Sequence, residues 1–564
     1  MRAITEVASV GPQDAALTPR RWLGRLAARQ RRLIGLSMGA GLCVGLATIV
    51  QMALIAGWLS ALLVDDAEPA ALAGLGVALI VVLALRAAAQ WAQEVAGQEA
   101  SLRIRQAARS ELLAHIEALG PVRLGGRHSA ALGGQLVEQV EALDGYFARF
   151  LPQLRLAVAI PAVIAVLVLW LDWLAAIFLL LAAPMIPLFM ALVGIGAERL
   201  NRQQFAAVSR LAGHFLDRVR GITTLQLFNR AEQASAEVHA AADDYRRLSM
   251  RTLRLAFLSS AVLEFFAAVA IAVLAIYIGF GLLGYIDYGP SPQLTLFSGL
   301  LILLLAPEFF QPLRTLSQHY HDRAAALGAA DALVALLNVP LAKGTARRQP
   351  SDGQSGVSLD GVSVTFAGRG RVLGPLDLTI APGECVALVG PSGAGKSTLL
   401  QLIAGFVDSD TGRVTVPAGE VAWMDQRPLL IHGSLADNLR LAAPEASDAD
   451  IERALEQAGL GELLTELPAG IDTALGERGA GLSGGQAQRL ALARVFLSGA
   501  SLVLLDEPTA SVDDDTQMAL IEALKALTAA GRTLVIATHH PALMGMAGRV
   551  VRLENGRRID EVMP

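Results

Sequence analysis

Six long apolar stretches lie before Arg314 in this chain of 564 residues. A helix of about 20 residues crosses the roughly 30 Å of hydrocarbon in a bilayer, and each stretch can supply such a helix. The sequence therefore predicts a bundle of six transmembrane helices. The stretches run over Leu33 to Leu63, Ala70 to Ala89, Leu154 to Leu171, Trp173 to Ala197, Ala256 to Leu283 and Leu294 to Leu313.

The composition changes along the chain. Hydrophobic residues make up 54% of it and charged residues only 17%, whereas soluble proteins have about 25% charged residues. The deficit falls before Arg314, and the part from Val357 onward has the composition of a soluble α/β domain. The net charge of -5 gives no support for a nucleic-acid partner. We expect a basic segment 1–32, a transmembrane domain 33–340, a linker 341–356 and a soluble α/β domain 357–564.

Arginine placement predicts the orientation in the membrane. Six arginines precede the first stretch, and the long segments 90–150 and 198–254 are also rich in arginine. Short loops on the other side carry acidic residues and no arginine, so the arginine-rich segments and both termini are expected in the cytoplasm. Helical patterning in the two long segments predicts that the spans continue as helices well beyond the bilayer.

Two acidic residues stand inside the predicted spans, Glu264 and Glu308. Ionisable groups are costly in lipid and are candidates for function. Either carboxylate would bind a cationic or amine-bearing cargo if it faced a substrate cavity, but it could equally pair with an arginine between helices or lie in a cytoplasmic extension of the span. Pro307 and Pro312 should bend the last span, because each removes a backbone donor.

Cysteine usage predicts no structural disulfide. Cys43 lies in an apolar stretch, and Cys385 precedes a glycine-rich loop in the soluble part. One bridge cannot serve two such different environments.

The glycine-rich loop has the pattern G-x-x-x-x-G-K-S and lies between the apolar run 386–389 and a helix-like stretch. In that context, the loop's backbone N–H groups can face the phosphates of a nucleoside triphosphate. Lys396 is expected to neutralise the β and γ phosphates, and Ser397 to offer its hydroxyl to Mg²⁺. The predicted nucleotide-binding residues are Gly390, Pro391, Ser392, Gly393, Ala394, Gly395, Lys396, Ser397 and Thr398.

Two acids follow the apolar run Ser501 to Leu505, which is typical of a buried parallel strand. Asp506 is expected to hold Mg²⁺ through water, and Glu507 to activate the water that attacks the triphosphate. Pro508 biases Glu507 away from helical geometry. Phe366, in an alternating stretch that predicts a small antiparallel sheet, could stack on adenine or be a core aromatic residue.

Between these motifs lies Leu482-Ser483-Gly484-Gly485-Gln486, at the start of a predicted helix whose N-terminus can receive a γ-phosphate. Together with the phosphate loop and the Asp-Glu strand, this LSGGQ pattern resembles the ATP-binding-cassette (ABC) family. The resemblance implies a type I exporter fold, α plus α/β, with a six-helix transmembrane bundle followed by a P-loop α/β nucleotide-binding domain, and it implies ATP and Mg²⁺ as cofactors.

The same resemblance assigns roles to further positions. Gln426 matches the glutamine that senses Mg²⁺ and contacts the membrane domain, and His539 matches the histidine that holds the γ-phosphate. Ser511 and Asp513 match a loop that communicates across a dimer. In this family the phosphate loop of one subunit closes on the LSGGQ of another, so one bundle with one nucleotide domain implies a half-transporter.

Several membrane segments are similar to a narrower family, the CydD subunits of the bacterial heterodimeric exporter CydDC. They are ALDGYFARFLPQL at 142–154, APMIPLFMALVGIG at 183–196, HFLDRVRG at 214–221, SAVLEFF at 260–266 and LAPEFFQPLR at 305–314. The resemblance implies a CydC-like partner, the bacterial inner membrane, export of glutathione or cysteine to the periplasm, and support for cytochrome bd assembly.

Other functions are compatible with the motifs. Haem is a further cargo that the resemblance suggests, and His319 and His321 could ligate its iron, although solvated or hydrogen-bonded histidines fit their spacing better. A homodimeric lipid or drug exporter is a second alternative. An ATP-gated channel or regulator is a third, and the complete set of ATPase residues argues for turnover instead.

Overall fold

The computed structural model describes residues 17–64, 72–124, 129–184, 207, 211, 215, 217–219, 221–286, 288–341, 349–351, 356–366, 368–426, 428–476, 481–509 and 514–562. The chain divides into two compact units. The helical unit comprises Met1–Glu117 and Arg127–Val339, and the α/β unit comprises Ala118–Gly126 and Pro340–Pro564. Segment 118–126, which the sequence places in the transmembrane domain, thus groups with the α/β unit.

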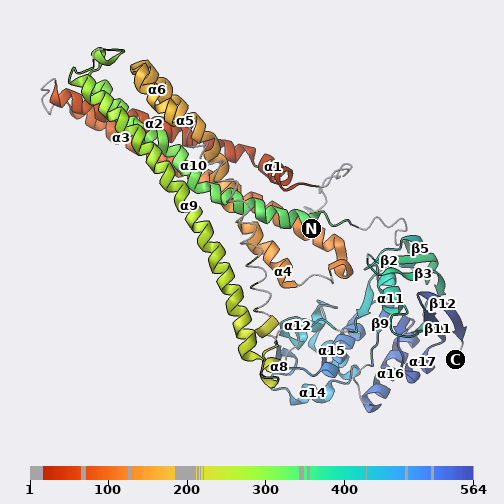
Figure 1. Cartoon of the computed structure of the whole chain (residues 1–564). Coiled ribbons are helices and arrows are strands. Elements are labelled where there is room, and N and C mark those ends of the chain that lie inside the picture. The colour runs from red at the N-terminus through yellow and green to blue at the C-terminus, as the bar shows by residue number, and fades with distance from the viewer. Residues whose placement is uncertain are drawn as a thin grey trace. The chain divides into compact units, whose positions relative to one another are not determined.

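The helical unit is built from long apolar helices (Figure 1). Five described helices are long and apolar enough to cross a membrane, and a sixth, α6, is apolar but short. The predicted span 173–197 is described only as far as residue 184, and the rest of it lies outside the described residues. The main helices are α2 (Arg31–Leu63), α3 (Ala73–Leu124), α5 (Leu151–Leu171), α6 (Trp173–Ala182), α9 (Ala231–Leu282) and α10 (Leu296–Leu337).

Two helices are far longer than a bilayer requires. α3 and α9 have 52 residues each, which corresponds to about 78 Å at 1.5 Å per residue. The predicted continuation of the spans as helices is therefore confirmed. α3 changes direction near its end, where Gly120 has φ 72° and ψ 171° and Pro121 follows. α10 runs from Leu296 to Leu337 through both Pro307 and Pro312, so the bend predicted there does not interrupt the helix.

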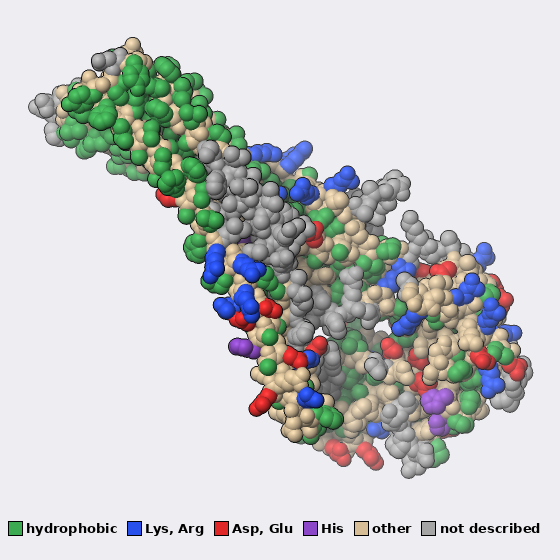
Figure 2. Space-filling model, in the orientation of Figure 1, with side chains coloured by type: hydrophobic (Ala, Val, Ile, Leu, Met, Phe, Trp, Pro, Cys, Tyr) green, Lys and Arg blue, Asp and Glu red, His purple; other side chains and the backbone are tan. Residues whose placement is uncertain are grey.

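Apolar and charged side chains separate along the helical unit. Figure 2 shows hydrophobic side chains over one end of this unit and basic and acidic side chains toward its other end. Large exposed hydrophobic residues on α3 and α9 contribute to the apolar end, among them Ile80, Leu85 and Ile276. Exposed apolar surface of this extent is what a lipid-facing helix presents.

The basic N-terminal segment contains an amphipathic helix. In α1 (Pro19–Arg29), Trp22, Leu23 and Leu26 share one face and are at most 1% exposed. This face packs against α10, while Arg25 on another face pairs with Glu111 of α3. Helix α1 is thus a packed part of the helical unit.

The buried residue Asp172 lies between α5 and α6, and its carboxylate contacts α6 and α9. Its Oδ1 accepts hydrogen bonds from the N–H groups of Leu174 and Ala175 at 2.9 Å each, which caps α6. Its Oδ2 accepts from the Tyr277 hydroxyl of α9 at 2.8 Å. Because Asp172 is only 1% exposed, these bonds offset the cost of burying its charge.

The α/β unit contains two larger sheets. One has the order β1-β5-β2-β3, in which β2 (Val357–Phe366) is antiparallel to both β3 (Gly370–Ile380) and β5 (Thr411–Pro417). The predicted antiparallel sheet is therefore confirmed, with β1 (Gln349–Ser351) added parallel to β5. The other sheet has the order β12-β11-β4-β10-β9-β6.

The second sheet forms the centre of the unit. Its strands are β4 (Cys385–Val389), β6 (Val421–Met424), β9 (Leu502–Asp506), β10 (Thr533–Ala537), β11 (Arg549–Glu554) and β12 (Arg557–Val562). β9 and β10 are buried along their whole length, as expected for parallel strands covered on both faces. Cys385, at the start of β4, is a free buried thiol, and Cys43 is free as well.

Shorter elements complete the two units. In the helical unit they are α4 (Ser129–Gly134), the single-turn π-helices η1 (Gln135–Gln139) and η2 (Tyr146–Phe150), α8 (Ile222–Leu227) and η3 (Ser291–Gln293). In the α/β unit they are α11 (Lys396–Ala404), β7 (Gly433–Ser434), α12 (Leu435–Arg440), α13 (Asp448–Gln457), α14 (Gly461–Glu466), η4 (Gly470–Asp472), β8 (Ala474–Leu475), α15 (Gly484–Leu497), α16 (Asp514–Ala529) and α17 (Pro541–Met546).

Replacing the buried carboxylate tests its role in the helical unit. We expect Asp172→Ala to lower the free energy of unfolding by about 2 kcal/mol or more, because a helix cap and a buried hydrogen bond are lost together. The measurement is chemical or thermal unfolding of the purified chain in detergent. Asp244→Ala, at a side chain that is 74% exposed, is the control and should change the free energy by less than about 0.5 kcal/mol. Equal effects of the two changes would contradict this role.

Candidate active site

Four neighbouring parallel strands bring the predicted site residues to one edge of the central sheet. In the strand pairing, Leu388 of β4 lies opposite Ala537 of β10, and Ala537 lies opposite Asp506 of β9. Leu505 of β9 lies opposite Met424 of β6. The phosphate loop follows β4, Asp506 ends β9 and Glu507 follows it, and His539 and Gln426 lie two positions beyond the ends of β10 and β6. Ligands bind at this carboxyl edge in open α/β sheets.

The phosphate loop links β4 to α11 in the predicted strand, loop and helix order. Gly395 is the N-cap of α11 with φ 102° and ψ 6°, a conformation that side-chain-bearing residues rarely adopt. At Gly390, an added Cβ would collide with the Leu553 carbonyl. The Lys396 ammonium donates to the carbonyl oxygens of Gly390 at 2.7 Å and Pro391 at 3.3 Å. The lysine therefore lies over the loop at the N-terminus of α11, where anions bind.

Asp506 is buried beside this loop. It is 4% exposed and is hydrogen-bonded to the Ser397 side chain. Burial raises the pKa of Asp506, and the nearby Asp425 and Glu507 carboxylates raise it further against the opposing effects of Ser397 and Lys396. A hydroxyl and a carboxylate in contact are oxygen donors of the kind that Mg²⁺ prefers, so the residues present fit this ion.

Glu507 has a strained backbone and a defined partner. Its φ of 56° lies in the left-handed region, which costs free energy for a residue other than glycine. Its N–H donates to the Ala537 carbonyl at 2.9 Å, which holds it against the end of β10. Its Oε2 lies 2.6 Å from His539 Nδ1. The predicted base and the predicted γ-phosphate ligand are thus paired, although they are 32 positions apart in the sequence.

The LSGGQ segment forms a complete helix cap. Ser483 Oγ accepts from the Gln486 N–H at 3.2 Å, and Gln486 Oε1 accepts from the Ser483 N–H at 2.8 Å. This reciprocal pair is a capping box at the start of α15. Gln486 therefore has a local structural role, and the helix N-terminus stays exposed for a ligand.

Two side chains of α15, Gln488 and Arg494, reach the chain that follows β6, and the sequence analysis did not find their contacts. Gln488 Nε2 donates to the Gln426 carbonyl at 3.4 Å. Arg494 donates to the Leu429 carbonyl and to the carbonyl and side-chain oxygens of Asn438, at 2.7 to 2.9 Å. These bonds tie the backbone around Gln426 to the LSGGQ helix. No local motif marks them, because each one joins residues 56 to 65 positions apart.

The remaining predicted site residues have varied settings. Phe366 is half-buried at the end of β2 and packs against the core of the α/β unit. Glu264 pairs with Arg314 of α10 at 2.8 Å, which is the arginine pairing considered as its alternative. Glu308 lines a cavity among α2, α3, α5 and α10. Ser511 and Asp513 lie outside the described residues.

The histidines considered for haem have a more ordinary setting. His319 Nδ1 lies 3.3 Å from Asp322 Oδ2 on the next turn of α10. Within the described ranges, no three His, Cys, Asp or Glu side chains gather as a metal site.

Comparisons with known proteins agree with this architecture. The family model described as ABC transporter transmembrane region matches residues 34–306, and the one described as ABC transporter matches residues 373–510. A solved structure of a bacterial Atm1-family ABC exporter with ATP bound has a TM-score of 0.74 at 20% identity, covering 96% of this chain and 95% of that one. The fold is therefore that of a type I ABC exporter, and the fold and site define an ATPase coupled to membrane transport.

Curated relatives narrow the assignment. The chain is 38% identical over 557 residues, 96% of its length and 94% of the relative's, to the glutathione/L-cysteine transport system ATP-binding/permease protein CydD of Escherichia coli strain K12. It is 34% identical over 455 residues, 77% of its length and 78% of the relative's, to the CydC protein of the same system in Bacillus subtilis strain 168. The chain belongs to the ABC transporter family and, within it, is similar to CydD proteins.

Removing the charge of Asp506 should change thermal stability and ATP hydrolysis in opposite directions. Because folding raises the pKa of this acid, stability falls as the pH rises from the ordinary aspartate range through the raised value. Asp506→Asn should therefore raise the apparent melting temperature of the nucleotide-free chain at neutral pH by a few degrees, while ATP hydrolysis is lost. Asp408→Asn, at an exposed position, is the control and should alter neither quantity. A lower melting temperature for Asp506→Asn would contradict the argument.

Proposed function

We propose that this chain is one half of a heterodimeric exporter in the bacterial inner membrane that moves glutathione or cysteine to the periplasm at the expense of ATP. The observation that carries the proposal is the 38% identity to a CydD protein over 96% of the chain. The convergence of Lys396, Asp506 and Glu507 at one sheet edge supports the ATPase part. Support for cytochrome bd assembly is part of the same proposal.

The phosphate loop is proposed to hold ATP, with residues Gly390 to Thr398 around the phosphates and Phe366 against the adenine. Lys396 would exchange the loop carbonyls for phosphate oxygens. Ser397 and Asp506 would hold Mg²⁺, with Gln426 completing its surroundings. Mg²⁺ bound there supplies positive charge that stabilises phosphoryl transfer.

Glu507 is proposed to be the general base. A water molecule between its carboxylate and the γ-phosphate would lose a proton to Glu507 as it attacks phosphorus. The contact between His539 and Glu507 places the imidazole beside this carboxylate, from where it can donate to the γ-phosphate. The left-handed backbone conformation of Glu507 would direct its side chain away from the carboxyl end of β9, toward the phosphate site.

The second half of each ATP site is proposed to come from a CydC-type partner. The exposed N-terminus of α15, with Leu482, Ser483, Gly484, Gly485 and Gln486, would face the ATP held by that partner. Backbone N–H groups in the first turn of a helix have no intrahelical acceptor and bind anions. Ser511 and Asp513 would contact the partner's nucleotide domain.

The cytoplasmic location of the termini and of the α/β unit is proposed from the arginine-rich segments. Arginine near membrane spans favours the cytoplasmic side. The extended parts of α3 and α9 would then carry movement between the nucleotide domains and the membrane.

A substitution at the base tests the ATPase assignment. Glu507→Gln should reduce the steady-state hydrolysis rate of the purified complex by about 10² to 10⁴, and ATP should remain trapped in a closed dimer. Glu522→Gln, at a surface residue paired with Lys525, is the matched control and should keep its rate within about two-fold of the wild type. Near-normal hydrolysis by Glu507→Gln would refute the assignment.

Transport by the purified complex tests cargo and partner. The tagged chain should co-purify with a CydC-type protein, and inside-out proteoliposomes of the complex should take up labelled glutathione or cysteine only when ATP is present. Uptake of haem instead of thiols would overturn the cargo assignment. Full activity of this chain without a second subunit type would favour a homodimeric exporter. Hydrolysis without flux of any of these compounds would favour the ATP-gated alternative.

A further inference from the structure

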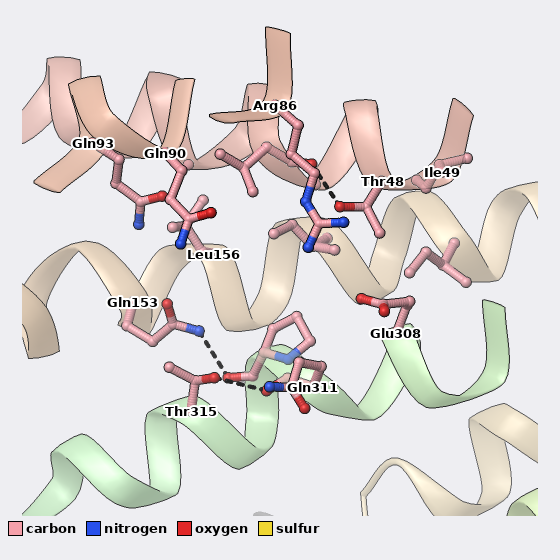
Figure 3. A pocket seen from close by; sticks show the side chains of 16 residues that line it. Thr48, Ile49, Arg86, Gln90, Gln93, Gln153, Leu156, Glu308, Gln311 and Thr315 are labelled. Carbon is pink, nitrogen blue, oxygen red and sulfur yellow. Dashed lines mark hydrogen bonds between the residues drawn. The ribbon is translucent and has the colours of Figure 1, made fainter. Parts of the chain in front are cut away.

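A cavity of about 260 Å³ lies inside the helical unit, among α2, α3, α5 and α10 (Figure 3). Pockets for drug-sized ligands have about 300 to 1,000 Å³, so this one suits an amino acid or one end of a small peptide. Leu156, Ile160 and Ile164 of α5 give it an apolar wall. The rest of the lining is rich in polar side chains, although every helix that contributes to it is apolar enough to cross a membrane.

The polar side chains form two rows at helical spacing. Arg86, Gln90 and Gln93 follow one another at four and three positions on α3, and Glu308 and Gln311 are three positions apart on α10. Residues three and four apart share a face of a helix. Figure 3 shows the two rows on opposite sides of the cavity, with Arg86 and Glu308 both directed into it.

The charges in this cavity are not neutralised by each other. Arg86 Nη1 donates to the neutral Gln51 Oε1 at 2.7 Å. Within the described part of the chain, Arg86 and Glu308 form no salt bridge, and the side-chain amides of Gln90, Gln93 and Gln311 have no hydrogen-bond partner. Glu264, by contrast, is paired with Arg314. Charged residues at membrane depth normally pair or line a functional cavity. The polar side chains of this cavity can therefore bind a ligand.

We infer that the cavity binds the α-amino-carboxylate group of the cargo, with its carboxylate at Arg86 and its ammonium at Glu308. A guanidinium can bind a carboxylate through two parallel hydrogen bonds. The glutamine amides can both donate to and accept from the remaining polar atoms, and the α5 wall contacts the apolar part. This assignment rests on the proposed function and specifies the chemical group that its cargo must carry.

The shared chemistry of the two proposed cargoes supports this assignment. Cysteine is an α-amino acid, and the γ-glutamyl residue of glutathione also carries a free α-amino group and a free α-carboxylate. One cavity with one cation and one anion can therefore receive either molecule without recognising the thiol directly.

Three related compounds test the assignment in proteoliposomes of the complete complex. Cysteine carries both charged groups, N-acetylcysteine lacks the ammonium, and cysteamine lacks the carboxylate. In the wild type, both analogues should need higher concentrations than cysteine for half-maximal ATP-dependent uptake. Glu308→Gln should raise the cysteine value about ten-fold or more and leave that of N-acetylcysteine unchanged. Arg86→Gln should also raise the half-maximal concentration of cysteine about ten-fold or more and leave the half-maximal concentration of cysteamine unchanged.

Controls separate recognition from structural damage. Glu264→Gln, outside the cavity, should keep the wild-type order of the three compounds, and Glu308→Asp should keep the preference for a free amine if Glu308→Gln does not assemble. Equal losses for all three compounds, or no change in either variant, would overturn the inference while wild-type uptake of cysteine upholds the proposed function. A wild-type complex that takes up neither cysteine nor glutathione would overturn the proposed function itself.

Discussion

The register of four buried parallel strands is the constraint on which the site depends. β4, β10, β9 and β6 end at the same edge of the sheet, so residues from four distant parts of the sequence become neighbours there. A slip of one residue in any pairing would turn each side chain of that strand to the opposite face. All side chains of β9 and β10 are buried, so a slip would disrupt close packing on both faces of these strands. Core packing therefore positions the reactive carboxylates.

Some charged side chains of the helical unit have partners within the protein, and others face a cavity without a salt bridge. Asp172 is satisfied by a helix cap and the Tyr277 hydroxyl, and Glu264 is paired with Arg314. These contacts stabilise the packing of one helix on another. The cavity between α3 and α10 differs, because Arg86 and Glu308 face it without forming a salt bridge with each other. Unmatched charge in an apolar surrounding is unfavourable in itself, and a ligand with complementary groups would relieve that cost.

Local patterns in the sequence predicted the candidate site residues, but not the contacts between residues that are far apart in the sequence. The phosphate loop, the Asp506–Glu507 pair and the helix after Ser483 follow from strand, turn and cap chemistry, which depends on a few neighbouring residues. The contact of Glu507 with His539 and the bonds from Arg494 to Asn438 need the sheet and helix packing, so no local pattern shows them. Hydropathy predicted six spans, and five described helices are long and apolar enough to cross a membrane. Hydropathy did not show that α1 packs its Trp22 face on α10. The rows that contain Arg86 and Glu308 did not emerge from the sequence, because their facing each other depends on how α3 and α10 pack.

The setting of Cys385 has a consequence for a protein that we propose handles thiols. Burial at the start of β4 raises the pKa of this cysteine to about 11. At neutral pH nearly all of its sulfur is protonated, and thiol-disulfide exchange requires the thiolate. Burial and protonation therefore make this thiol a poor partner for mixed disulfides with glutathione.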